Sequence, residues 1–215
     1  MPNPMKRLDS CRARALLFLA LCLPLAAIAD NPAPDVLVRT TTDDVMRLLQ
    51  DDKDLKAGNP ARVVGLIEEK IVPHFDFARM TKLAVGRSWR EATPEQQKAL
   101  VHEFQTLLVR SYATAYTAYR QIKVDVKPLK LAGGEDDVTV KSQILLPGGA
   151  PPVGVDYSMG ASPEGWKVYN IAVDGVSLVT TYRNDFGAQI QQGGLDALIR
   201  SLQARNSKPV GQARK

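Results

Sequence analysis

Few residues in this 215-residue chain could do acid–base or metal chemistry. There are two histidines, His74 and His102. His102 is followed by Glu103, as in a zinc-binding helix, but Thr106 occupies the position where that motif has its second histidine. His74 precedes Asp76 by two residues, so that carboxylate could orient its ring, although a histidine at a helix edge explains the same spacing. Neither histidine predicts a catalytic centre.

The other chemistry-bearing patterns are equally incomplete. No serine lies in a G-x-S-x-G motif, and the glycine pairs at 133–134, 148–149 and 193–194 lack the strand–loop–helix context of a phosphate-binding loop. Acidic clusters at 51–54 and 135–137 could attract calcium, but their spacing fits no EF-hand loop and is typical of solvated turns. The sequence therefore predicts a protein that is not an enzyme and needs neither a metal nor a cofactor.

The first 29 residues have the pattern of a secretory signal peptide. Four basic residues between 6 and 14 precede an apolar run from Ala15 to Ile28, and small residues at 27 and 29 predict cleavage after Ala29. An uncleaved membrane anchor is the alternative, but the run of about 14 residues is shorter than the roughly 20 that a spanning helix needs.

Removal of this peptide changes the composition of the working protein. Both cysteines, Cys11 and Cys22, are removed, so the mature chain must fold in an oxidising compartment without a disulfide. Four basic residues and one acid are removed with them, which lowers the net charge from +5 to +2. The pI of 9.2 therefore overstates the basicity of the mature protein, and nucleic-acid binding is not expected.

Helical signals dominate the first half of the mature chain. Thr93, Pro94 and Gln96 form a capping box with proline at the first helical position, and they begin a helix of about 25 residues. Its apolar face consists of Val101, Phe104, Leu108, Tyr112, Ala115 and Tyr119. Shorter helices are predicted at 36–50, with its best part from Thr42 or Asp43, at 63–71 and at 77–85, and a final pair at 177–192 and 195–204.

Between residues 121 and 176 the hydrophobic period changes from about four to two. Four alternating runs, at 122–127, 137–146, 153–159 and 167–173, are separated by glycine- and proline-containing turns, and a turn at 174–175 follows them. Four strands joined by short loops predict an antiparallel meander with one apolar face. The fold class is thus α+β, with a four-stranded antiparallel sheet covered by the long helix and the C-terminal helices. The domains are a cleaved peptide at 1–29, one domain at 30–205 (helices at about 36–120 and 177–205) and a disordered tail at 206–215.

Two apolar patterns are less ordinary than the rest. Tyr112, Tyr116 and Tyr119 follow one another on one side of the long helix, and a stripe with a spacing of four runs from Leu178 to Ile190. Core packing explains both patterns. A cavity wall explains them as well, because helices lying loosely on a sheet leave an apolar pocket.

Several motifs resemble the MlaC family, also called toluene-tolerance auxiliary proteins. They are Pro73 with Phe75-Asp76-Phe77, Gly86 with Trp89, Gly165-Trp166-Lys167-Val168 and Gly175-Val176-Ser177. The resemblance covers roughly residues 36–203, with Asn170 standing where the family pattern has Asp. It implies a cystatin-like or nuclear-transport-factor-like sheet wrapped by helices, with an apolar cavity between them.

The resemblance also implies a function. Such proteins are monomeric periplasmic carriers of phospholipid. They shuttle it between an outer-membrane lipoprotein–porin complex and an inner-membrane ABC transporter with a hexameric lipid-binding subunit. This traffic maintains the lipid asymmetry of the outer membrane. Bound phospholipid is cargo rather than cofactor. An isomerase or dehydratase of the nuclear-transport-factor type, or a ligand-free interaction module, are the alternatives. From the inward phase of each element we predict these lipid contacts: Val101, Phe104, Leu108, Tyr112, Ile144, Val155, Tyr157, Tyr169, Ile171, Val173, Leu178, Tyr182 and Phe186.

Overall fold

The computed structural model describes residues 31–118 and 122–208. They belong to one compact unit that begins at Asn31. The predicted signal peptide and the end of the basic tail lie outside the described residues, as do the side chains of Tyr116 and Tyr119. Among the described residues, none of the helices combines the length and the apolarity that crossing a bilayer would require.

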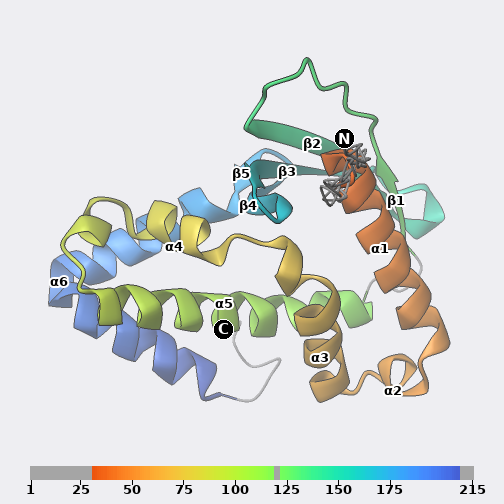
Figure 1. Ribbon diagram of the computed structural model, residues 1–215. Helices are drawn as coiled ribbons and strands as arrows, with labels where there is room; N and C mark the ends of the chain where they lie inside the picture. Colours follow the sequence, from red (N-terminus) through yellow and green to blue (C-terminus); the bar gives the residue numbers. More distant parts are fainter. Residues whose placement is uncertain (1–30, 119–121, 209–215) are drawn as a thin grey trace, which may run out of the picture. The chain divides into compact units, whose positions relative to one another are not determined.

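Helices form most of the chain before and after the sheet-forming segment in the sequence (Figure 1). The α-helices are α1 (Pro34–Asp51), α2 (Lys53–Lys56), α3 (Pro60–Lys70), α4 (Phe77–Val85), α5 (Pro94–Ala118) and α6 (Leu178–Asn206). Short 3₁₀ helices are η1 (Val72–His74), η2 (Gly86–Arg90) and η3 (Pro147–Gly149).

Local capping signals determine several of these boundaries. The Thr93 hydroxyl accepts a hydrogen bond from the Gln96 amide at 3.2 Å, and the Gln96 side chain accepts one from the Thr93 amide at 3.0 Å. The Asp76 carboxylate accepts from the Arg79 amide at 2.8 Å and caps α4, which ends at Gly86 with a φ of 68°. Both predicted boundaries are confirmed because the signals lie within a few residues of the helix ends.

Helix α1 begins earlier than the sequence pattern suggests. Its first residue is Pro34, eight residues before the predicted strong part at Thr42. The threonine run is accommodated because the Thr40 and Thr42 hydroxyls donate to backbone carbonyls one turn earlier, at 2.9 and 2.7 Å. The first turns of α1 are therefore helical despite three consecutive β-branched residues.

The sheet has five antiparallel strands in chain order rather than the predicted four. They are β1 (Lys123–Val126), β2 (Asp137–Leu145), β3 (Val153–Ser162), β4 (Gly165–Val173) and β5 (Val176–Ser177). The additional strand has two residues, too few for an alternating pattern to reveal. It follows the predicted turn at Asp174 and Gly175, whose φ angles are 47° and 81°, as in the tight hairpin turns that favour Asp-Gly.

A β-bulge interrupts the alternation in β4. Ser158 pairs with Asn170, but its neighbour Met159 pairs with Val168, so Tyr169 is an extra residue on β4. Beyond the extra residue, the side chains of β4 point to the opposite faces from those that strict alternation would give. As a result, Tyr169 packs with the helices, whereas Val168 and Ile171 pack on the apolar face of the sheet.

The outer edge of β4 is covered where β5 stops. Phe75 forms a parallel bridge with Val168, and the Asp76 amide donates to the Val168 carbonyl at 2.9 Å. The segment before α4 thus occupies an edge that would otherwise expose unpaired backbone groups.

The helices divide between covering the sheet and packing on one another. Helix α1 lies against β1 and β2, while α4 and α6 meet β4 (Figure 1). Helix α5 packs mainly with α3, α4 and α6. We expected α5 and the C-terminal helices to cover the apolar face, but the buried helical residue on that face is Val38 of α1.

Helix α6 consists of two segments, as predicted. Gly194 has a φ of 75° and a ψ of −177°, which no right-handed helix accommodates. The second segment packs back on α5: Gln96 donates to Asp196 at 2.7 Å, and Asn206 donates to the Glu103 side chain at 2.7 Å.

Candidate functional site

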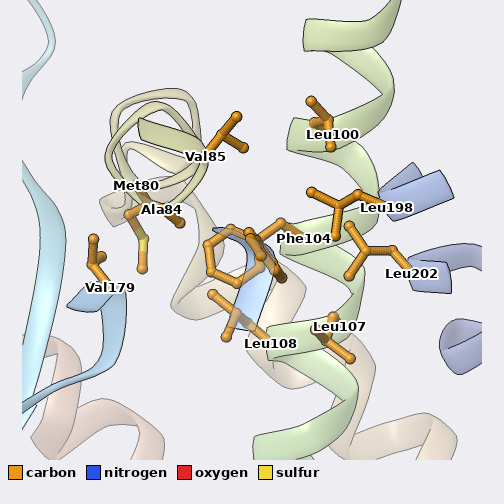
Figure 2. Close-up of a cluster of buried hydrophobic side chains, with 11 residues drawn as sticks. Met80, Ala84, Val85, Leu100, Phe104, Leu107, Leu108, Val179, Leu198 and Leu202 are labelled. Atoms are coloured by element: carbon orange, nitrogen blue, oxygen red, sulfur yellow. The ribbon is translucent and has the colours of Figure 1, made fainter. Parts of the chain in front are cut away.

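The buried apolar residues, Val155 apart, form three clusters that share no member. The helical cluster lies between α4, α5 and α6 (Figure 2). It consists of Met80, Ala84, Val85, Leu100, Phe104, Leu107, Leu108, Val179, Phe186, Leu198 and Leu202. Phe104 is its aromatic centre, with edge-to-face contacts to Tyr182 and Phe186 at ring-centroid distances of 4.9 and 5.1 Å.

The other two clusters meet different parts of α1, one near its start and one in its second half. The N-terminal cluster consists of Val45, Leu49, Leu55, Val63, Leu66, Ile67, Val109 and Ala113. The sheet cluster consists of Val38, Val126, Val140, Met159 and Val168. Helix α1 contributes to both of them, α5 joins the N-terminal cluster to the helical cluster, and Phe75 packs against both the helical cluster and the sheet cluster.

This division is unusual for a domain of this size, which generally has one contiguous core. Half-buried apolar side chains lie at the margins of the three clusters. They include Phe75, Tyr157, Ile171, Ile71 and Val72. Among the described residues, the apolar interior therefore has surfaces that the protein only partly covers.

The register of the sheet shows where its apolar face is covered and where it is open. One row across the sheet runs from Val126 through Ser142 and Val155 to Val173 and Val176. The exposed fraction is 2% at Val126, 46% at Val173 and 66% at Val176. Helix α1 thus buries this row at β1 and β2, and the row is open at its β4–β5 end. Elsewhere on β4 the same face is covered, because Val168 is 4% exposed.

The predicted lipid contacts separate into groups in this structure. Phe104, Leu108 and Phe186 are buried in the helical cluster, with Tyr169, Leu178 and Tyr182 half-buried at its margin. Tyr157 and Ile171 are half-buried at the margin of the sheet cluster.

The remaining predicted contacts lie outside the three clusters. Val155 is buried, Val101 and Ile144 are half-buried, and Tyr112 and Val173 are exposed. The apolar face of the sheet holds Ile144, Val155, Tyr157, Ile171 and Val173. Their side chains point to one face because the strands pair these positions with residues of the same face on β2, β3 and β4. The structure therefore brings together the sheet part of the predicted set, and it separates that part from Phe104 and Phe186.

Arg79 of α4 contacts the other face of the sheet, and the sequence pattern did not indicate this role. The Arg79 guanidinium lies 3.5 Å from the centroid of the Tyr169 ring and pairs with Asp137 at 2.8 Å. It crosses Gly160, where a Cβ atom would come within 2.5 Å of an Arg79 nitrogen. The cation therefore holds the bulged tyrosine against α4.

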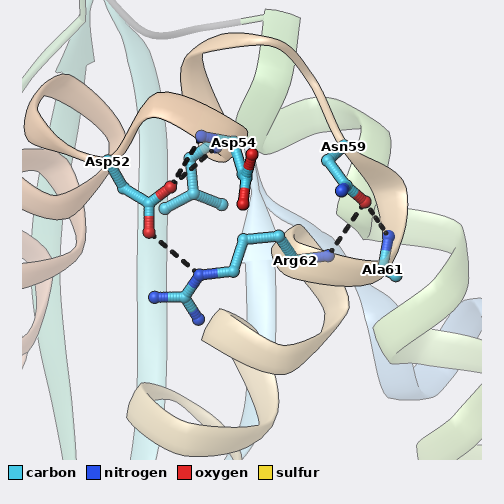
Figure 3. A network of polar contacts seen from close by, with 6 residues as sticks. Asp52, Asp54, Asn59, Ala61 and Arg62 are labelled. Carbon is cyan, nitrogen blue, oxygen red and sulfur yellow. Dashed lines mark hydrogen bonds and ion pairs between the residues drawn. The ribbon is translucent and has the colours of Figure 1, made fainter.

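The acidic clusters considered for calcium have structural partners. Asp52 accepts from the amides of Asp54 and Leu55 at 2.8 and 3.0 Å, and from Arg62 Nε at 2.9 Å (Figure 3). Through these bonds it caps α2 and joins α2 to α3, whose own cap is Asn59. The hydrogen bond from the Leu55 amide, followed by that from Arg62, lowers the pKa of Asp52. Within the described ranges no group of three histidine, cysteine or acidic side chains could hold a metal ion.

Ionisable groups are scarce on the apolar face. Burial raises the pKa of the Tyr157 phenol, and a hydrogen bond with Ser142 opposes this effect. Asp125 and Asp156 lie on the opposite face and pair with Lys127 and Lys141 at 2.5 and 3.1 Å. An isomerase or dehydratase of this architecture would need an inward acid or histidine on the strands, and none of the described strand positions on this face provides one.

Within residues 31–118 and 122–208, no hydrogen bond or ion pair is found for the His74 side chain. Partial burial, followed by the nearby charge of Lys167, lowers the pKa of its imidazole. The Lys167 ammonium itself donates to the Pro73 carbonyl at 2.8 Å. These contacts position the η1 turn against β4.

Asn170, where the family pattern has Asp, has a structural role. Its Oδ1 accepts from the Ser177 hydroxyl at 2.9 Å and from the Val179 amide at 3.2 Å, at the start of α6. Both bonds need an acceptor and neither needs a charge, so Asn serves here as Asp would.

Comparisons with known proteins agree with the sequence motifs. The family model described as "MlaC protein" matches residues 39–204. A solved phospholipid-binding protein from Ralstonia solanacearum, in complex with a phospholipid, is 39% identical with a TM-score of 0.76, and the match covers 86% of this chain and all of that one.

Two curated relatives match over nearly their whole lengths. The intermembrane phospholipid transport system binding protein MlaC of Haemophilus influenzae is 22% identical over 89% of this chain and 90% of its own. The toluene tolerance protein ttg2D of Pseudomonas putida is 27% identical over 85% of this chain and 84% of its own.

Proposed function

Because the chain belongs to the MlaC family, we propose that it is a phospholipid carrier whose acyl chains lie against the apolar face of the sheet. The observation that carries the proposal is the loss of burial along one apolar row, from 2% exposed at Val126 to 46% at Val173. An apolar sheet face that ends uncovered at one side is a surface that hydrocarbon can enter and complete. The Ralstonia protein, which matches this chain over most of its length, was solved with a phospholipid bound.

The proposed contacts begin with the residues that share this face. Ile144, Val155, Tyr157, Ile171 and Val173 form the sheet wall. The half-buried Leu178, Tyr182 and Tyr169, with Val101 and Tyr112, are the proposed contacts outside this wall. Phe104, Leu108 and Phe186 lie in the helical cluster and form no part of this wall.

The energetics explain why a carrier of this kind needs no catalytic group. Hiding one methylene from water is worth about 0.8 kcal/mol, so two chains of about 15 methylenes total roughly 24 kcal/mol. Unassisted escape of a phospholipid into water is therefore extremely slow. A binding surface as apolar as a bilayer makes transfer nearly neutral, and the direction of transport must then come from the partners rather than from the carrier.

The finer parts of the proposal follow from family membership. The chain is exported to the periplasm after cleavage at Ala29, and it shuttles lipid between an outer-membrane lipoprotein–porin complex and an inner-membrane ABC transporter. This traffic maintains the lipid asymmetry of the outer membrane. The name of the Haemophilus relative, a binding protein of an intermembrane phospholipid transport system, supports this assignment.

The test is native mass spectrometry of the purified protein, followed by lipid extraction. We expect a co-purifying phospholipid, lost in Ile171→Asp because that change places a charge on the apolar face. The matched control is Val36→Asp, which places the same charge at an exposed position of α1. Ligand-free wild-type protein that takes up no phospholipid from vesicles would refute the proposal, as would full lipid occupancy in a folded Ile171→Asp variant.

A further inference from the structure

Four exposed basic residues lie in or beside the segment where α4 ends and η2 begins, and they are here called the basic surface: Lys82, Arg87, Arg90 and Arg183. Lys82 lies in the last turn of α4. Arg87 and Arg90 are three residues apart in η2, where three residues complete one turn, so both project from the same side. Arg183 comes from α6, and its Nε lies 3.6 Å from the position that a Cβ on Gly86 would take.

The part of the chain that the structure describes offers these charges no partner. Eight ion pairs join cations and carboxylates among the described residues, and none of them includes a member of the basic surface. The side-chain hydrogen bonds found over the same residues also leave all four out. The carbonyl end of α4 favours a cation nearby, but this effect is weak and extends over one turn. Four neighbouring cations repel one another, and an external anion would relieve that repulsion.

Apolar side chains interrupt the basic surface. Leu83 follows Lys82 and is 36% exposed, which is high for a leucine on a helix that packs against a core. Trp89 lies between Arg87 and Arg90 in sequence and is half-buried against the helical cluster. Guanidinium groups bind phosphates in two-pronged geometry, and leucine or tryptophan beside them suits the boundary between head groups and acyl chains.

We propose that the basic surface docks the protein on the surface of an anionic phospholipid bilayer. This inference goes beyond the proposed function, because it concerns where the outside of the protein binds and holds whether or not lipid occupies the interior. An acidic protein surface is the competing occupant. We favour the bilayer because an acidic partner would satisfy the four charges without using the exposed Leu83.

The experiment is co-sedimentation of the exported, processed protein with vesicles. Vesicles of equal parts phosphatidylglycerol and phosphatidylethanolamine are compared with vesicles of phosphatidylcholine. Arg87, Arg90 and Arg183 are changed together to Gln, and the control variant carries Lys53→Gln, Lys123→Gln and Lys130→Gln. The control removes the same charge from exposed lysines elsewhere on the molecule.

We expect wild-type protein and the control to bind the anionic vesicles and to release them as salt is raised, because surface charges are screened. Each basic residue near an anionic membrane strengthens binding about fivefold, so the arginine variant should bind at least tenfold more weakly. Its thermal midpoint and its content of extracted lipid should equal those of the wild type, which separates this inference from the proposed function.

Three results would overturn the inference. Wild-type protein that ignores anionic vesicles would do so, as would equal losses in the two variants, which would indicate an effect of net charge alone. If the arginine variant kept its vesicle binding but lost lipid exchange with a partner protein, the basic surface would be a protein-docking site instead.

Discussion

Phe104→Ala separates core packing from lipid contact most clearly, because the sequence predicts Phe104 as a lipid contact and the structure buries it completely in the helical cluster. A buried Phe→Ala change costs about 3–5 kcal/mol in free energy of unfolding. Phe104 also makes two edge-to-face ring contacts, each worth about 0.5–1.5 kcal/mol, so we expect the upper part of that range, about 4–5 kcal/mol. For a domain of this length the thermal midpoint should fall by roughly 8–20 °C.

The assay is urea and thermal unfolding of lipid-loaded and lipid-stripped protein. Bound lipid stabilises the folded state by mass action, so the two forms differ in absolute stability. The loss caused by Phe104→Ala should nevertheless be the same in both forms if the ring is core. Val64→Ala, at a half-buried position of α3 beside the N-terminal cluster, is the control and should cost about 1 kcal/mol in both forms. A loss below about 1 kcal/mol in stripped protein, together with a large loss in loaded protein, would refute the assignment of Phe104 to the core.

Three further predictions concern polar groups. Asn170→Ala should lower the free energy of unfolding by about 1–2 kcal/mol because it removes the hydrogen-bond acceptor at the start of α6, whereas Asn170→Asp should change it little. Urea unfolding of both variants tests this, and equal losses would contradict it. Burial raises the pKa of Tyr157, so the stability that this group contributes is complete below its ordinary pKa of about 10 and is lost as pH rises above it. Above a pH of about 10 the thermal midpoint of Tyr157→Phe should therefore fall less steeply with pH than that of the wild type. Parallel curves for the two proteins would count against this prediction. Asp52→Ala should lower the free energy of unfolding at pH 7 through loss of the α2 cap, and the wild type alone should lose this contribution as pH falls through the depressed pKa of Asp52. Urea unfolding at pH 7 and at acid pH tests this, and a variant as stable as wild type at pH 7 would show that the cap contributes nothing.

Local signals predicted the helices well because each is specified within a few residues. The capping box at Thr93 and Gln96 and the Asp76 cap both form the hydrogen bonds expected of them. The turn at Asp174 and Gly175 was also predicted from its own two residues, and their positive φ angles confirm it. These features depend on backbone geometry that the side chains next to them determine, so a single sequence suffices.

Features that depend on distant pairing were not predictable in this way. The bulge at Tyr169 becomes visible only when β3 and β4 are paired, and it moves Tyr169 away from the face that Ile171 occupies. The role of α1 as the cover of β1 and β2 depends on Val38 meeting Val126 and Val140, residues far apart in the chain. Periodicity shows that a helix or strand has an apolar side, but it does not show what that side contacts.

The way α6 folds back at Gly194 has a consequence for how the polypeptide is made and delivered. Leu198 and Leu202 are fully buried in the helical cluster, which also contains Met80 and Leu100 from much earlier in the chain. The cluster therefore cannot close until the chain as far as Leu202 is available. A chain that threads through a translocation pore with its N-terminus first would keep this region open along the whole passage, and it would acquire its stable form only on the far side.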